Sequence, residues 1–168
     1  MYGRIALAFV VGVSLGCGGS SDGSGVASVD FTGNYAGTST NGNNTCPGTW
    51  DTGQMADGQM NLVQSEEDVQ FQAQGQTGLA FLFAFGSASF SGKVDGDHVE
   101  AVIVGSPMFT QGECSYAWKG KLSANLDGDT LTGSLNYTPD ANGHADCSTY
   151  KVIGCSRSLT FKYMRPKR

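Results

Sequence analysis

Residues 116–137 read YAWKGKLSANLDGDTLTGSLNY, and this stretch decides the fold. Apolar or small residues alternate with polar ones on both sides of Asp127-Gly128-Asp129. A period of two is typical of a half-buried strand, and Asp-Gly is favoured in tight hairpin turns because both residues tolerate positive φ. The stretch therefore predicts two antiparallel strands joined by a short turn, with one apolar face.

The same alternation continues outward in both directions, and no amphipathic helix is predicted. A second Asp-Gly-Asp, at residues 95–97, stands between apolar strand ends in the same way. The stretch that carries Leu79, Phe81, Phe83 and Phe85 is the most apolar of the expected strands. The apolar faces of about eight strands fall at residues 31–35, 60–62, 69–73, 79–94, 99–103, 116–122, 131–137 and 159–163. This pattern predicts an all-β fold, an antiparallel up-and-down β-barrel of about eight strands, with a β-sandwich as the alternative.

The connections between these strands alternate in length. Those after the second, fourth and sixth strands are short, whereas the others are mostly longer and should gather at the opposite end of the barrel. Four cysteines fall at this loop end. The sixth and seventh strands are hairpin neighbours, which pairs Cys114 with Cys147, and barrel closure pairs Cys46 with Cys155. The local pairing of Cys147 with Cys155 stays open as an alternative.

The N-terminal region predicts export. Arg4 precedes an apolar run at residues 5–13, which is too short to span a bilayer and is typical of a signal peptide over residues 1–16. Residues 17–29 are rich in Gly and Ser and predict a flexible tether. Residues 30–168 then form the β-barrel domain, which is large enough to bury a core.

Residues 14–17, Ser-Leu-Gly-Cys, resemble the lipobox of bacterial lipoproteins, in which the cysteine is lipidated and becomes the new N-terminus. The resemblance implies a lipid such as palmitate on Cys17. It also implies a place in the cell envelope, anchored in the outer membrane; a secreted protein is the alternative. Lipidation of Cys17 leaves an even set of four cysteines, as expected for an exported protein that pairs its thiols.

Several classes of function are disfavoured by the composition. Ten Lys and Arg stand against fifteen Asp and Glu, a net charge of −5, which argues against nucleic acid as a partner. His98 and His144 are expected at opposite ends of the barrel, and the sequence has no nucleophile elbow, phosphate loop or zinc spacing. We therefore expect a monomer that is not an enzyme and needs no cofactor.

A metal site is the weaker interpretation of one loop. Asp140, Asn142 and Asp146 are similar to part of a calcium loop, but the segment lacks the length and the bidentate Glu of such loops. The favoured interpretation is a polar hairpin loop without a metal.

A ligand site is expected inside the barrel. Gly33, Gly120 and Gly133 share the apolar face and leave room, and an eight-stranded barrel can hold one small ligand. The residues expected to contact it are Phe81, Phe83, Phe85, Tyr116, Trp118, Tyr137 and Phe161. A core filled by these side chains is the alternative.

The chain also resembles lipocalin-type barrels, which carry Gly-x-Trp on the first strand and a basic residue near the end of the last, packed across the closed end. Gly33-Asn34-Tyr35 and Arg165 occupy these places, with Tyr35 where the family has Trp. The resemblance implies a barrel that binds a small apolar molecule. We expect a membrane-anchored binding module for such a ligand, or for an envelope protein or glycan at the loop end. The alternative is a structural or interaction lipoprotein with a filled core.

Overall fold

The computed structural model describes residues 29–106 and 108–167, and its elements are nine strands and two helices within those ranges. The strands are β1 (Gly33–Asn44), β2 (Met55–Ser65), β3 (Asp68–Gln74), β4 (Ser89–Asp95), β5 (His98–Val104), β6 (Phe109–Gln111), β7 (Cys114–Asp127), β8 (Thr130–Ala141) and β9 (Arg157–Met164). The helices are α1 (Gly75–Phe85) and α2 (Ala145–Thr149). Neither helix is long and apolar enough to cross a membrane, and the described ranges hold no other candidate.

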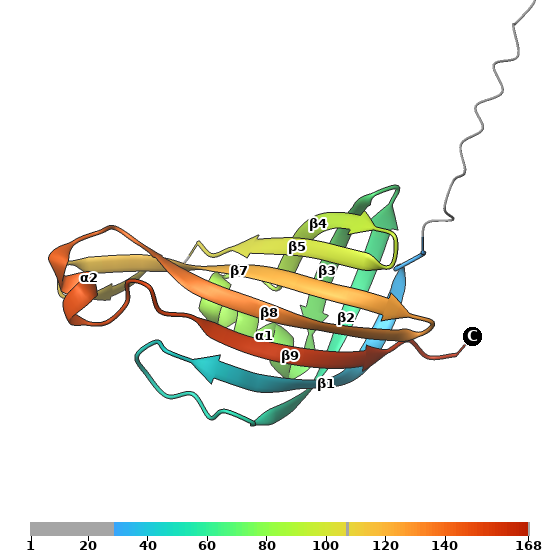
Figure 1. Cartoon of the computed structure of the whole chain (residues 1–168), viewed down its shortest axis with the longest axis horizontal. Coiled ribbons are helices and arrows are strands. Elements are labelled where there is room, and N and C mark those ends of the chain that lie inside the picture. Colours follow the sequence, from blue (N-terminus) through green and yellow to red (C-terminus); the bar gives the residue numbers. More distant parts are fainter. Residues whose placement is uncertain (1–28, 107, 168) are drawn as a thin grey trace, which may run out of the picture.

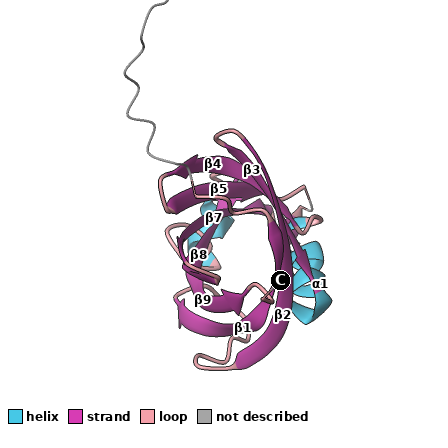
Figure 2. Cartoon of the chain, turned by 90° about the vertical axis from the view of Figure 1, so that its right-hand side faces the viewer, coloured by secondary structure: helices cyan, strands magenta, loops and turns pink. Residues whose placement is uncertain are grey.

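Eight of the strands close into an antiparallel barrel (Figure 1). Strands β1 to β5 are neighbours in chain order, β5 pairs with β7, and β7, β8 and β9 lead back to β1. The short strand β6 pairs with β7 beyond the point where β5 ends. Figure 2, which looks along the barrel, shows the closed ring of strands. The predicted up-and-down barrel is confirmed, and the sandwich alternative is wrong.

The two ends of the barrel differ as predicted. Tight turns join β2 to β3, β4 to β5 and β7 to β8 at the closed end, and Gly96 and Gly128 take positive φ angles of 63° and 57° in two of them. The longer connections, residues 45–54, 75–88, 105–113 and 142–156, lie at the other end. This second end, which carries α2 in Figure 1 and the strand β6 beside the start of β7, is the loop end.

Arg165 lies across the closed end, in the position that the lipocalin-type resemblance implies. Its guanidinium is 5.6 Å from the centre of the Tyr35 ring and donates to the Asp129 carboxylate at 3.2 Å and to the Thr32 carbonyl at 3.0 Å. A Cβ atom at Gly33 would stand 2.7 Å from the Arg165 side chain, so this crossing needs the glycine. The Arg165 side chain thereby covers the closed end of the barrel.

The prediction of a strand over residues 79–85 is wrong. The structure has the helix α1 there, and the fourth strand begins only at Ser89. Gly75 and Gly86 flank the helix with positive φ angles of 66° and 70°, and the Gly86 N–H donates to the Leu82 carbonyl, an arrangement typical of a helix end. Because β3 and β4 have only seven residues each, α1 takes the space beyond their ends and packs against β2, β3 and β7.

The helix separates side chains that a strand would have placed together. Its buried residues are Thr77, Gly78, Phe81 and Phe85, which follow helical spacing. Phe83, a predicted ligand contact inside the barrel, is instead 81% exposed to solvent. The run Leu-Ala-Phe-Leu-Phe-Ala-Phe is apolar at every position, so it fits a period of two and a period of 3.6 equally well.

Candidate functional site

Two disulfides brace the loop end. Cys46 is joined to Cys155 and Cys114 to Cys147, each with 4.8 Å between Cα atoms. These are the two pairs that the strand count predicts, and the local pair of Cys147 with Cys155 does not form. All four cysteines are buried.

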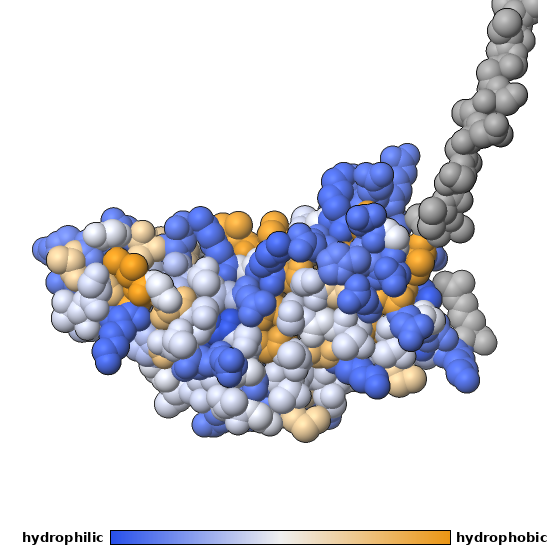
Figure 3. Space-filling model, viewed as in Figure 1, coloured by the Kyte–Doolittle hydropathy of each residue, from blue (hydrophilic) through white to orange (hydrophobic). Residues whose placement is uncertain are grey.

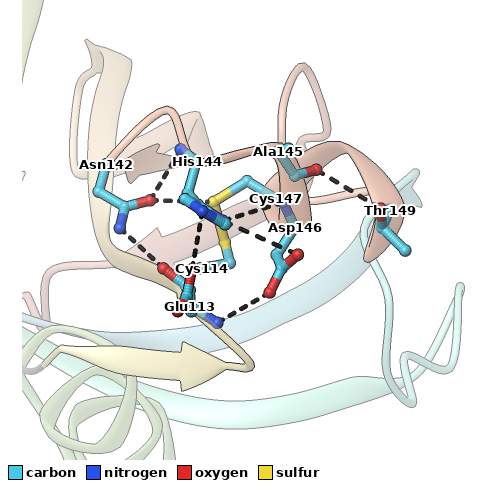
Figure 4. Close-up of polar contacts among 8 residues, drawn as sticks. All are labelled: Glu113, Cys114, Asn142, His144, Ala145, Asp146, Cys147 and Thr149. Carbon is cyan, nitrogen blue, oxygen red and sulfur yellow. Dashed lines mark hydrogen bonds and ion pairs between the residues drawn. A yellow bond between two sulfur atoms is a disulfide. The ribbon is translucent and has the colours of Figure 1, made fainter.

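A polar cluster surrounds the Cys114–Cys147 bridge (Figure 4). The His144 Nε2 atom is 2.9 Å from a Glu113 carboxylate oxygen, and the Asp146 N–H donates to His144 Nδ1 at 3.3 Å, which caps α2. The Glu113 N–H donates to the Asp146 carboxylate, and the Asn142 side chain donates to the Glu113 carbonyl, both at 2.9 Å. The cluster ties α2 to the start of β7.

The geometry gives no support to a metal site in this loop. Asp140 forms an ion pair with Lys119 at 2.7 Å, whereas Asn142 and Asp146 contact the backbone of Glu113. Within residues 29–106 and 108–167, no three His, Cys, Asp or Glu side chains are grouped so that they could hold a metal ion. The three residues of the calcium alternative do not converge.

The two histidines lie at opposite ends of the barrel, as expected. His98 follows the β4–β5 turn at the closed end, where its Nδ1 atom is 2.8 Å from the Asn125 side-chain oxygen. His144 belongs to the cluster at the loop end. The two side chains therefore cannot act on one substrate.

A pocket of about 110 Å³ opens at the loop end, between α1 and the connection 45–54. The lining comes from β1, β2, β8 and β9, from α1, and from Trp50 of the connection 45–54. The lining residues are Ser39, Asn41, Trp50, Ala56, Gln76, Thr77, Ala80, Phe81, Ala84, Phe85, Tyr137 and Leu159. Because Ala80 and Ala84 are small, the helix leaves this space where larger side chains would fill it.

Tyr137 is the unusual member of this lining. Its side chain is only 6% exposed and lies edge-on to the rings of Trp50, Phe85 and Trp118, at 5.6 to 5.9 Å between centroids. Its hydroxyl has no hydrogen-bond partner among the described residues, although every fully buried side-chain oxygen or nitrogen there has one. The hydroxyl must therefore keep contact with solvent, and the pocket is the hollow that Tyr137 lines. Burial raises the pKa of Tyr137, and the positive charge of Arg157 opposes this shift.

The buried hydroxyls behind the pocket are, in contrast, satisfied. The Tyr163 hydroxyl lies near the hydroxyls of Thr77 and Ser39, whose oxygens are 3.4 Å apart. Burial raises the pKa of Tyr163, and hydrogen bonding to these two hydroxyls opposes the shift. A Cβ atom at Gly58 would stand 2.6 Å from both the Thr77 and Tyr163 oxygens, so the glycine leaves room for this group.

Arg157 fixes the rim of the pocket. Its guanidinium lies 5.4 Å from the centre of the Trp50 ring and 5.2 Å from that of Trp118, within the range of cation–π attraction. It also donates to the Pro47 carbonyl at 2.7 Å and to the Asn44 side chain at 3.1 Å. The connection 45–54, and Trp50 with it, is thus held against β9.

The residues expected to contact a ligand are spread over several environments. Phe81, Phe85 and Tyr137 line the pocket. Tyr116 and Trp118 belong to the same aromatic cluster but lie nearer the tip of the loop end, and Phe161 is buried deeper, stacked on Tyr163 at 5.4 Å. Phe83 points away from the barrel, so its prediction as a ligand contact is wrong.

Sequence reasoning missed part of the pocket lining. Thr77, Ala80 and Ala84 were outside the expected set because no helix was predicted, and Trp50 was outside it because it lies in the connection 45–54 and not on a strand. No signal in the sequence marked them, because the spacing of Thr77, Phe81 and Phe85 fits a strand as well as a helix.

Comparison with known proteins adds little. No protein-family model matches the chain, and no curated protein matches it. Among solved structures, the chain is similar to that of EF1p2_mFAP2b bound to DFHBI, with 16% sequence identity and a TM-score of 0.46 over 80% of this chain and 93% of that chain. A likeness of this size does not bear on function.

Proposed function

We propose that this protein is a lipid-anchored protein of the bacterial cell envelope, and that it binds one small, largely apolar molecule in the pocket beside α1 without catalysing a reaction. The unpaired hydroxyl of Tyr137 carries the proposal. A bound molecule with one hydrogen-bonding atom would take the place of the solvent that this hydroxyl contacts, and one net hydrogen bond contributes about 0.5–1.5 kcal/mol. The rest of the lining, from Leu159 to Phe81 and Ala84, suits an apolar body.

The volume of the pocket limits the ligand. At about 110 Å³ the space is below the roughly 300–1,000 Å³ of typical ligand pockets. An apolar cavity of about 150 Å³, somewhat larger than this pocket, holds benzene. The ligand is therefore at most a single-ring molecule, or a larger one of which part of a ring or a short chain enters between Trp50 and α1.

Tyr137→Phe tests the proposal directly. Benzaldehyde and toluene serve as probes of nearly equal size, of which only benzaldehyde can accept a hydrogen bond. The substitution is expected to weaken benzaldehyde binding by about 2- to 10-fold, the worth of one net hydrogen bond, and to leave toluene binding unchanged. Titration followed by NMR or calorimetry measures both. Failure of both probes to bind the wild-type protein would reject the proposal.

Tyr163→Phe is the matched control for stability. Tyr137→Phe removes a hydroxyl without a protein partner, so the free energy of unfolding should stay the same or rise. Tyr163→Phe removes hydrogen bonds to Thr77 and Ser39 and should lower that free energy by about 1 kcal/mol. Equal losses in the two variants would mean that the Tyr137 hydroxyl is paired.

The membrane anchor is a separate part of the proposal, because Cys17 lies outside the described residues. Cys17→Ser should move the protein from the membrane to the soluble fraction, since the acyl chains supply the affinity for the bilayer. Mass spectrometry of the wild-type N-terminal peptide should find acyl groups on Cys17. An unmodified Cys17, together with unchanged membrane partition in the variant, would contradict the anchor.

The aromatic packing at the loop end favours the alternative function. Rings of Phe85, Tyr137 and Trp118 pack edge to face there. A structural or interaction lipoprotein would use the connection around Trp50 to recognise a protein or glycan. It predicts that neither ring-sized probe binds, so the same titration decides between the two.

A further inference from the structure

Helix α1 presents an uncovered apolar ridge. Leu79, Leu82 and Phe83 are 58%, 48% and 81% exposed. The helix sequence, GQTGLAFLFAF, contains no charged residue. A large apolar side chain exposed alone is common, but several together on one helix usually mark a contact surface.

The ridge continues onto the segment beside α1. The Ser106 N–H donates to the Phe85 carbonyl at 3.1 Å, which holds Ser106 against the end of the helix. Val104 and Met108, two residues to either side of Ser106, are also exposed. In Figure 2, α1 lies outside the ring of strands beside β2, on the side opposite β8. Figure 3 shows the face over β8 and β9, which is mainly polar, so the two sides of the barrel differ.

We infer that α1 docks on a neutral lipid surface, namely the bilayer that the proposed anchor at Cys17 reaches. A lipid interior rewards burial of Phe and Leu side chains and penalises charge. A surface helix with apolar side chains and no charge meets both conditions. Because the helix has no basic residue, the contact requires no anionic lipid and should withstand salt.

The tether is long enough for this arrangement. The twelve residues from Gly18 to Val29 can span about 40 Å when extended. The barrel begins beside the β2–β3 turn, where the Phe31 N–H donates to the Gln64 side chain. From that turn, the seven residues of β3 lead to α1 over about 23 Å. An anchored Cys17 and α1 can therefore lie at the same membrane surface.

The docking of α1 rests on the lipid anchor at Cys17 that is part of the proposed function, and it narrows the class of ligand. Phe81 and Phe85 line the pocket from the inner side of the helix whose outer side carries Leu82 and Phe83. Docking of α1 would thus bring the pocket to within the thickness of one helix from the bilayer. The ligand class that fits is a lipid-soluble molecule with a ring-sized apolar group.

Phe83→Trp measures the contact. The exported protein is reconstituted in phosphatidylcholine vesicles whose acyl chains carry bromine, a tryptophan quencher, and the signal of wild-type Trp50 and Trp118 is subtracted. Asn136→Trp is the control, because Asn136 is exposed on β8, opposite α1. The tryptophan introduced on α1 should be quenched several-fold more than the one introduced on β8, with emission shifted to the blue, at low and at high salt.

Two results would overturn the inference. One is equal quenching of the two introduced tryptophans. The other is a blue shift of the Phe83→Trp variant without vesicles that grows with protein concentration, which would assign the ridge to a second copy of the chain. Both readouts are independent of benzaldehyde binding and of the acyl mass on Cys17, so failure of the docking is distinguishable from failure of the pocket or of the anchor.

Discussion

Replacing Cys46 and Cys155 together by Ala is expected to lower the free energy of unfolding by about 5 kcal/mol. The two cysteines are 109 residues apart, and a cross-link over that length removes much of the entropy of the unfolded chain. The bridge also joins the connection after β1 to the segment before β9, the two strands whose pairing closes the barrel. Since small domains are stable by about 5–15 kcal/mol, the variant should be close to unfolding.

The second bridge provides the control for this experiment. Cys114 and Cys147 are 33 residues apart, so their replacement should cost about 4 kcal/mol in the same denaturant titration. Only the Cys46–Cys155 variant should also lose probe binding, because that bridge holds the connection that carries Trp50. A larger loss of stability from the 33-residue bridge would contradict the role given to barrel closure.

The barrel and its bridges were predictable because they depend on the parity of strands and connections. Because successive strands run in opposite directions, successive connections lie alternately at the two ends of the barrel. The Asp-Gly turns at residues 96 and 128 mark the closed end. Once the closed end and the loop end are assigned, each cysteine has few possible disulfide partners. The strand β6 was missed because three residues are too few to show a period.

The helix and half of the pocket were not predictable in the same way. The run over residues 79–85 is apolar at every position and shows neither the period of a strand nor that of a helix, so its conformation depends on tertiary context. Strands β3 and β4 are short, and a helix fills the space beyond their ends. Tyr137 could be assigned to the interior because it lies in a strand with clear alternation. Ala80 and Ala84 could not, because their role exists only on a helix.

Phe85→Ala is expected to lower the free energy of unfolding by about 3–5 kcal/mol, as is usual for a buried Phe. Phe85 is 1% exposed, and its ring lies edge-on to Phe81 at 6.0 Å and to Tyr137 at 5.7 Å. Phe83→Ala, in the same helix, is the matched control. Because Phe83 is 81% exposed, its loss should change stability by no more than about 0.5 kcal/mol.

The comparison of these two variants decides between a helix and a strand over this segment. Residues 83 and 85 lie on one face of a strand but are about 200° apart around a helix, at 3.6 residues per turn. A strand would therefore make both substitutions costly, whereas α1 makes only Phe85→Ala costly, and equal losses in denaturant titrations would reject the helix. Truncation of Phe85 also enlarges the pocket beside Ala84, so the variant should gain affinity for probes larger than toluene, and Phe83→Ala should leave that affinity unchanged.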